Sequence, residues 1–278
     1  MAASVGKFQV LGTLGTGAHS TILHIRRASD SREYALKVVN IDDEDDVKFL
    51  EQARHEFRVA KMLDHPNLIK ISIAEEERTW LFRVKKIQLL IEYVRGKALD
   101  QVPLMAPTKL LVVAQKIAAG MVHMHRRGVY HADLKPNNIM MAPGGVVKII
   151  DFGLAWIKGE EKDRVQGTPE YMAPETVKDK VVNDATEIFN FGATLYRLLT
   201  LRNSPNLLEA METMKVNDKV WRELLKPITD FNPKVPAELA NLVHQCLEYS
   251  PKRRPQSMSD VQERITQLMQ ELGVEDDA

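Results

Sequence analysis

The sequence predicts an α+β protein, with mostly antiparallel strands toward the N-terminus and a larger, mostly helical part after them. Two observations predict this class. Before residue 95, short apolar runs with strand-like alternation surround a single helical pattern. After residue 95, apolar residues recur mainly every three or four positions over long segments, which is the spacing of helices packed on a core.

The composition is that of an ordinary globular protein. The chain has 278 residues, of which 44% are hydrophobic and 27% are charged. Lys plus Arg and Asp plus Glu are equal at 38 each, so no global field favours nucleic acid or an acidic membrane. No run reaches the ~18 apolar residues of a membrane span, and no signal-peptide core is present. We expect a cytoplasmic protein, or the cytoplasmic domain of a longer one, with its one cysteine, Cys246, buried.

The N-terminal part contains a glycine pair between two expected strands. Gly15 and Gly17 would let backbone N–H groups approach a phosphate closely, although such a pair alone is weak evidence. The charged stretch 75–86 is expected to form a strand with a longer than usual loop. The other expected elements before residue 95 are strands at 8–14, 21–25, 34–39 and 88–94 and a helix at 50–63.

Polar residues stand at both ends of an expected hairpin in the middle of the chain. Two short apolar runs flank the turn sequence Ala-Pro-Gly-Gly at 142–145. Antiparallel pairing across this turn would bring Asn138 and Asp151 close together, and their oxygens are ligands that Mg²⁺ prefers. Nearby, Asp133 could accept a proton, and Lys135 could neutralise a moving phosphoryl group.

Helical patterns dominate the remainder of the chain, where residues 206–232 are poorly patterned apart from short helical stretches. An acidic tail ends the chain. The long expected helices lie at 108–127, 187–201, 237–248 and 257–272.

The central stretch resembles the catalytic loop and the Asp-Phe-Gly segment of the protein kinase family. The family's His-Arg-Asp is His-Ala-Asp here, at 131–133, and 133–138 has the form found in serine/threonine kinases. Residues 15–20 resemble the family's glycine loop, and residues 167–175 resemble its substrate-docking loop.

The resemblance covers residues 8–272 and implies a bilobal protein-kinase-like fold. A small lobe at 8–94 would hold an antiparallel sheet and one main helix. A larger, mostly helical lobe would occupy 95–272, and the acidic tail would occupy 273–278.

The resemblance also implies a reaction, the transfer of the γ-phosphoryl group of ATP to Ser or Thr hydroxyls of a protein substrate. In this reaction Asp133 would orient the hydroxyl and accept its proton, and Lys135 would offset transition-state charge. Lys37, fixed by Glu56, would position the phosphates. Thr168 would bridge Asp133 and Lys135.

The implied cofactors are ATP and Mg²⁺, with Mn²⁺ as a possible substitute. Asn138 and Asp151 would hold the metal. The positions implied for nucleotide binding are Leu14, Gly15, Gly17, Ser20, Ile22, Ala35, Lys37, Ile91, Glu92, Val94, Met140 and Asp151.

The sequence departs from the family pattern at several positions: Ser20, Ala60, Ala132 and Glu187. With Ala132 the unbalanced charge of the usual arginine is absent, and Thr168 is the only Ser or Thr between Asp151 and Glu175. We therefore expect a kinase that does not require activation-loop phosphorylation. The alternatives are a pseudokinase scaffold that binds nucleotide or a partner protein and, less favoured because of the docking loop, a small-molecule phosphotransferase. We expect a protein substrate and no nucleic acid, and the oligomeric state stays open.

Overall fold

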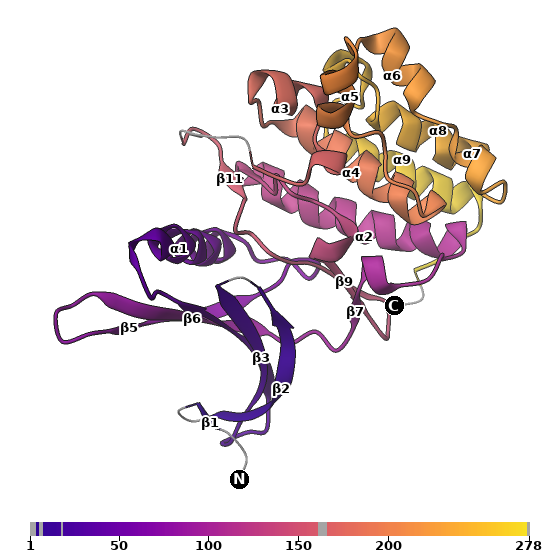
Figure 1. Ribbon diagram of the computed structural model, residues 1–278. Coiled ribbons are helices and arrows are strands. Elements are labelled where there is room, and N and C mark those ends of the chain that lie inside the picture. Colours follow the sequence, from indigo (N-terminus) through magenta and orange to yellow (C-terminus); the bar gives the residue numbers. More distant parts are fainter. Residues whose placement is uncertain (1–3, 6–7, 18, 161–165, 277–278) are drawn as a thin grey trace. The chain divides into compact units, whose positions relative to one another are not determined.

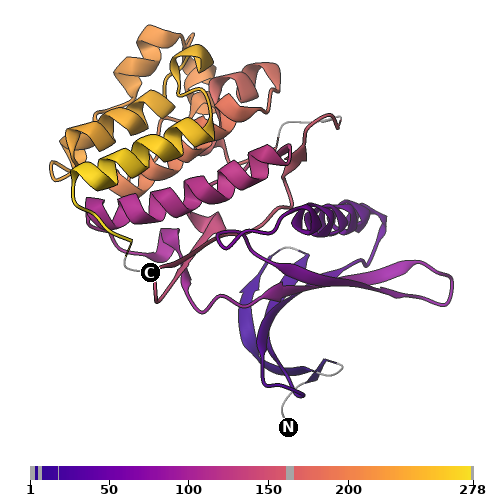
Figure 2. The ribbon, with the colours of Figure 1, turned by 180° about the vertical axis from the view of Figure 1, so that it is seen from behind.

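A computed structural model shows a curved antiparallel sheet with a helix packed across it (Figures 1 and 2). It also shows a second, mostly helical part. The structure describes residues 4–5, 8–17, 19–160 and 166–276. Residue 18 of the expected glycine loop, residues 161–165 of the expected activation segment and residues 277–278 of the tail lie outside these ranges.

The contacts within the chain define two units, and this agrees with the expected α+β class of a sheet part and a helical part. The first unit comprises the described residues up to 64, with 68–95 and 151–153. The second comprises residues 65–67, 96–150 and the described residues from 154 onward.

Among the described residues, the first unit contains a six-stranded antiparallel sheet in the order β1-β2-β3-β4-β6-β5. Helix α1 (Val47–Met62) packs on β4, β5 and β6. The sheet's apolar core includes Ile25, Leu36 and Leu90. The strands are β1 (Ser4–Val5), β2 (Phe8–Thr16), β3 (Ser20–Arg27), β4 (Glu33–Asn40), β5 (Ile71–Arg78) and β6 (Val84–Glu92).

Helix α1 is amphipathic, and its three-four apolar spacing explains which face it buries. Leu50, Ala53, Val59 and Ala60 are buried on the face toward the sheet. Glu56 is buried on the same helix, so a carboxylate enters an otherwise apolar face. A buried carboxylate needs a partner, and its partner belongs to the candidate site.

The hairpin formed by β5 and β6 corrects the prediction of a long loop within residues 75–86. Strand β5 continues to Arg78 and β6 begins at Val84, so only residues 79–83 connect them. Charged residues of these strands form ion pairs: Glu76 pairs with Arg78 and with Arg54 of α1, and Glu77 pairs with Lys86 across the two strands. Trp80 and Phe82 at the tip are 86% and 81% exposed, and the hairpin extends beyond the end of α1 (Figure 1).

The second unit is mostly helical. Helices α2 and α9 lie side by side, and α4 packs against α2, α8 and α9 (Figures 1 and 2). Its helices are α2 (Pro107–Arg126), α3 (Pro174–Asp179), α4 (Asp184–Thr200), α5 (Leu207–Thr213), α6 (Asp218–Leu224), α7 (Ile228–Phe231), α8 (Ala237–Cys246) and α9 (Met258–Glu271). Its strands are β7 (Lys97–Ala98), β8 (Val129–Tyr130), β9 (Ile139–Ala142), β10 (Val146–Ile149) and β11 (Trp156–Ile157). Within the described ranges, no helix is both long enough and apolar enough to span a bilayer.

Helix α4 forms the centre of this unit, and local signals fix where it begins. Asn183 caps it in a capping box with Thr186, so the first turn presents Glu187 inward. Gly192 is needed further along the helix, because an added Cβ there would lie 2.7 Å from Cβ of Cys246 on α8. The glycine therefore allows the close approach of α4 and α8.

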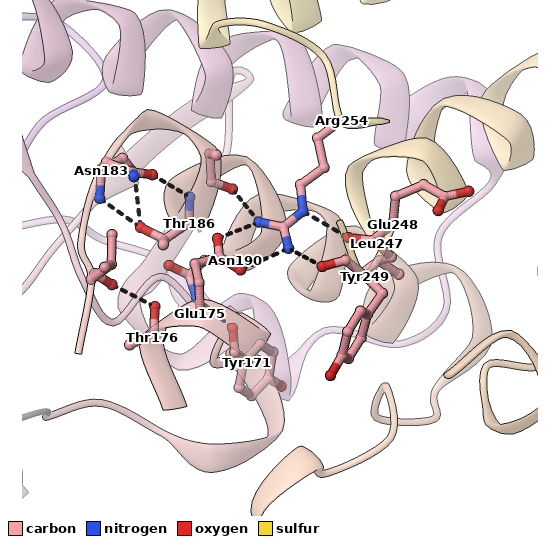
Figure 3. A network of polar contacts seen from close by, with 12 residues as sticks. Tyr171, Glu175, Thr176, Asn183, Thr186, Asn190, Leu247, Glu248, Tyr249 and Arg254 are labelled. Carbon is pink, nitrogen blue, oxygen red and sulfur yellow. Dashed lines mark hydrogen bonds and ion pairs between the residues drawn. The ribbon is translucent and has the colours of Figure 1, made fainter. Parts of the chain in front are cut away.

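A buried ion pair joins α3 to the segment between α8 and α9 (Figure 3). The Arg254 guanidinium donates to both oxygens of Glu175, over 2.6 and 2.9 Å. Its remaining N–H groups donate to the carbonyl oxygens of Ala185, Glu248 and Tyr249, so every N–H of the guanidinium has an acceptor. This pair holds the start of α3 against α4.

Candidate active site

The loop between β8 and β9 carries the acidic residue at the centre of the candidate site. Asp133 is buried, and Oδ2 of its carboxylate lies 2.8 Å from Lys135 Nζ. Asn138 Nδ2 donates to the Asp133 carbonyl oxygen over 2.9 Å and to Oδ2 over 3.3 Å. Lys135 therefore forms an ion pair with Oδ2, and Asn138 donates a hydrogen bond to the same oxygen.

The other oxygen of Asp133 is held by Thr168. Its backbone N–H and its hydroxyl both donate to Oδ1, each over 2.8 Å. Lys135 Nζ donates to the same hydroxyl over 2.7 Å, so Thr168 links the acid to the ammonium group. Both oxygens of the carboxylate are thus oriented by donors, and two of these donors belong to Thr168.

Glu187 of α4 binds the backbone of the loop between β8 and β9. One carboxylate oxygen accepts from the His131 N–H over 2.6 Å, and the other accepts from the Ala132 N–H over 2.8 Å. The glutamate therefore reaches both N–H groups. Ala132 has a φ of 64°, a left-handed conformation that a Cβ disfavours, so these bonds also hold strained backbone. The His131 ring contacts the Ile150 carbonyl oxygen over 3.1 Å.

Strands β9 and β10 form the predicted antiparallel hairpin. Ile139 pairs with Ile149, and the Ile150 N–H donates to the Asn138 carbonyl oxygen over 2.8 Å. Met140 lies within β9 and is half-buried. The chain then enters the first unit at Asp151.

An ammonium–carboxylate pair occupies the first unit. Lys37 Nζ on β4 lies 2.6 Å from Oε2 of Glu56 on α1. Burial lowers the pKa of Lys37, but the carboxylates of Glu56 and Asp151 outweigh burial and raise it, so the ammonium stays charged. Burial also raises the pKa of Glu56 in spite of Lys37, so this carboxylate depends on Lys37 for its charge. Ala60, one of the positions that depart from the family pattern, does not prevent Lys37 and Glu56 from pairing.

Asp151 stands at the start of the Asp-Phe-Gly segment in an unusual backbone conformation. Its φ is 65°, and one of its carboxylate oxygens accepts from the Gly153 N–H over 3.1 Å. The following Phe152 is fully buried, whereas Asp151 itself is exposed. An added Cβ at Gly153 would lie 2.8 Å from the Gln52 amide nitrogen, so a larger residue here would require the Gln52 side chain to shift.

The glycine loop joins β2 and β3. The Gly17 N–H donates to the Ser20 carbonyl oxygen over 2.7 Å, which closes the turn, and Gly15 pairs with Ile22. Leu14 stands before this turn and is 48% exposed. The other implied nucleotide positions of this unit lie on β4 and β6 or just after β6: Ala35, Ile91, Glu92 and Val94.

The two candidate metal ligands can be compared with magnesium only by the chemical type of their oxygens. Among the described residues there is no cluster of three or more His, Cys, Asp and Glu side chains suited to a metal ion. Mg²⁺ bound with a nucleotide usually takes one or two protein oxygens and several phosphate or water oxygens. The carboxylate of Asp151, in the first unit, and the amide oxygen of Asn138, in the second, are each a type of oxygen that Mg²⁺ prefers.

Sequence reasoning missed a buried histidine beside this loop. His125 on α2 lies next to Asp184 and Glu187, and its side chain is 8% exposed. In the sequence it is one histidine within an apolar helical pattern, which is more often a core residue than a functional one. One signal in the sequence could have indicated a buried cation here: Asp184 stands one helical turn before Glu187, so two acids share one face of the helix.

The antiparallel sheet unit and the larger helical unit are consistent with the fold of a protein kinase domain. The chain belongs to the protein kinase family, because the family model for the protein kinase domain matches residues 8–270. The expected α+β class and the expected family are therefore confirmed.

Curated relatives carry the same family name. The chain is 33% identical over 262 residues to a probable serine/threonine-protein kinase of Dictyostelium discoideum, which covers 90% of this chain and 26% of that protein. It is 26% identical to the serine/threonine-protein kinase PrkC of Bacillus subtilis, covering 94% of this chain and 40% of that protein. With the CBL-interacting serine/threonine-protein kinase 3 of Arabidopsis thaliana it shares 30% identity over 82% of this chain and 55% of that protein. The chain thus spans between a quarter and about half the length of these relatives.

Proposed function

We propose that this domain transfers the γ-phosphoryl group of ATP to Ser or Thr hydroxyls of a protein substrate. The arrangement of Asp133, Lys135 and Thr168 carries the proposal, because it presents a fixed carboxylate beside a fixed ammonium group. Relatives named as serine/threonine-protein kinases support the class of acceptor. Since the reaction consumes ATP, the proposal places the domain in the cytoplasm.

On the acceptor side, Asp133 orients the substrate hydroxyl and takes its proton. The oxygen then bonds to the γ-phosphorus while the bond from that phosphorus to the β–γ bridging oxygen breaks, and ADP leaves. Lys135 offsets the negative charge of the transferring group, and Thr168 holds both side chains in place. Positioning supplies most of the rate in this chemistry, so contacts shorter than 3 Å on Asp133 support the assignment.

On the nucleotide side, Lys37 binds the α- and β-phosphates, and Glu56 holds Lys37 in position. Its raised pKa supports this role, since the ammonium remains charged near the anionic phosphates. The backbone of Glu92 and Val94 binds the adenine edge. The remaining nucleotide contacts come from Leu14, Gly15, Gly17, Ser20, Ile22, Ala35, Ile91 and Met140.

Asn138 and Asp151 are the proposed ligands of Mg²⁺, and Mn²⁺ has the same preference for such oxygens. When bound, the ion neutralises charge on the phosphate oxygens. The Nδ2 group of Asn138 donates to Asp133, which leaves the amide oxygen to act as the ligand. Asn138 would then connect the metal with the acid.

We also propose that the domain acts without phosphorylation of its activation segment. Ala132 carries no cation that a phosphate would have to neutralise. The unmodified Thr168 hydroxyl donates to Asp133 and accepts from Lys135, and the Thr168 N–H also donates to Asp133. Phosphatase-treated protein should therefore transfer phosphate at an unchanged rate. A Thr168→Val variant that kept full activity would count against the docking role of Thr168.

The first test is the transfer of labelled phosphate from ATP with Mg²⁺ to a generic protein substrate. We expect transfer by the wild type and by the control Asp230→Asn, which changes an exposed acid on α7, and none by Asp133→Asn. Equal transfer by Asp133→Asn would refute the role of Asp133. ATP binding without transfer by any of the three proteins would favour a scaffold instead.

A further inference from the structure

We propose that His125 and Asp184 are positioning residues for the transfer reaction. The His125 imidazolium, held between two carboxylates, keeps Glu187 charged and in place to bind the backbone of the catalytic loop. This inference rests on the proposed function. It adds two residues outside the sequence-predicted site, and it makes the rate depend on pH in a stated range.

His125 lies between two carboxylates of α4. Its Nδ1 atom lies 3.1 Å from Oδ1 of Asp184, and its Nε2 atom lies 3.6 Å from Oε2 of Glu187. Neither contact is aligned as a hydrogen bond. The attraction is therefore one between charges, and it requires both ring nitrogens to carry protons.

Glu187 is a deeply buried carboxylate. Its side chain is 1% exposed, and a carboxylate that deep is costly unless a cation compensates for it. The N–H groups of His131 and Ala132 satisfy its oxygens but bring no full positive charge. His125 supplies that charge, and it lies beside the same oxygen that binds the His131 N–H. Burial raises the pKa of Glu187, but His125, with smaller contributions from His131 and the Ala132 N–H, outweighs burial, so the pKa is lowered.

Asp184 keeps His125 charged. The titratable groups that face the ring are Asp184 and Glu187 from α4 and Tyr130 from β8, with His131 beyond Glu187. The Tyr130 hydroxyl donates to Asp184 over 2.9 Å, and burial followed by Asp184 raises the pKa of Tyr130, so Tyr130 remains neutral. Burial alone would lower the pKa of His125, but the two carboxylates outweigh it and raise the pKa to about 9.

Proton release from His125 is therefore coupled to the position of the catalytic loop. Below pH 9 the imidazolium is present, and the Glu187 carboxylate holds the loop that presents Asp133. Above pH 9 the ring loses its proton, Glu187 loses its compensating charge, and the loop becomes less well positioned. A misplaced base lowers the rate of the chemical step and leaves substrate binding unchanged.

The experiment measures kcat and KM between pH 6 and 10 for four proteins. They are the wild type, His125→Gln, Asp184→Asn and the control His123→Gln, which changes a histidine two residues away on the same helix. We expect the wild-type kcat to fall through pH 9. In Asp184→Asn the fall should begin about one pH unit lower, with activity at pH 6 retained, because a single carboxylate then faces the ring.

In His125→Gln, kcat should be lowered roughly ten- to hundredfold at every pH, with both KM values unchanged and no fall at pH 9. His123→Gln should match the wild type. A second measurement does not depend on activity. NMR titration of histidine-labelled protein, with the His125 signal assigned by its loss in His125→Gln, should give a pKa near 9 that falls in Asp184→Asn.

A His125 signal that titrates near 6.5, or an alkaline limb of kcat that Asp184→Asn leaves in place, would overturn the proposal. So would a His125→Gln activity that falls only as far as the folded fraction falls. Absence of transfer by the wild type at pH 6.5 would instead overturn the proposed function, and this inference with it.

Discussion

Replacing Arg254 tests whether the buried pair with Glu175 stabilises the second unit through its full set of hydrogen bonds. The Arg254 guanidinium is fully buried, and each of its N–H groups has an acceptor (Figure 3). Met at this position fits the space but leaves the Glu175 carboxylate and three carbonyl groups without their donor. Breaking such a pair usually costs about 3–5 kcal/mol, since an uncompensated charge remains buried.

Arg254→Lys gives a finer test, because charge is kept while the donor geometry is lost. An ammonium has three donors and cannot bind both oxygens of Glu175 and three carbonyl groups at once. Each lost bond to a charged or buried partner costs about 1–3 kcal/mol, so we expect a loss of at least about 2 kcal/mol.

Urea unfolding followed by tryptophan fluorescence measures both variants. Trp221 is buried beside Phe189, and Trp156 stacks on Tyr130, so both report on the second unit. Trp80 is already exposed and contributes little to the change. A loss below 1 kcal/mol in Arg254→Met would refute the reasoning, and so would an Arg254→Lys protein as stable as the wild type.

Four further predictions follow from single features. Lys37→Met should lower the transfer rate about 10²-fold, because a fixed charge at the phosphates is lost, and an unchanged rate would exclude that role. Ala132→Gly should change the free energy of unfolding by less than about 1 kcal/mol. Ala132→Val should lower it by about 2 kcal/mol or more, because a branched residue tolerates the φ of 64° poorly. Equal urea midpoints for the two variants would contradict this. Gly192→Ala should destabilise by about 2 kcal/mol despite alanine's better helix propensity, since its Cβ would meet Cys246 at 2.7 Å, and a stabilised variant would refute the close approach. The pKa of His125 rises from 6.5 to about 9 on folding, so the charged ring stabilises the folded state by an amount on the order of 3 kcal/mol. This stabilisation is full below pH 6.5 and is lost as the pH rises through 9. Equal urea midpoints at pH 6 and pH 9.5 would contradict this.

Periodic segments were predictable because their local pattern agrees with their packing. The expected helix at 108–127 is α2, and the expected helix at 257–272 is α9, each within about two residues. The hairpin at 139–150 was likewise predictable, because a turn signal stood between two apolar runs.

Other features depended on contacts that no local pattern contains. Strands β5 and β6 continue through the charged stretch, where Lys86 pairs with Glu77 on the neighbouring strand. The sequence suggested a loop there, since charge is more common in loops. His125 was missed for a related reason: its partners stand about sixty residues later, and only the packing of α4 on α2 brings them together.

The donors on Asp133 have a consequence for the use of ATP. Thr168 occupies one oxygen of its carboxylate with two donors, and Lys135 and Asn138 occupy the other. A hydroxyl that gives its proton to Asp133 must displace one of these groups, and the 3.3 Å bond from Asn138 is the longest. A hydroxyl held in place by the rest of a protein substrate can make this exchange, whereas a single water molecule competes poorly with fixed neighbours. On the proposed function, the same donors that orient Asp133 therefore limit the wasteful hydrolysis of ATP when no substrate is bound.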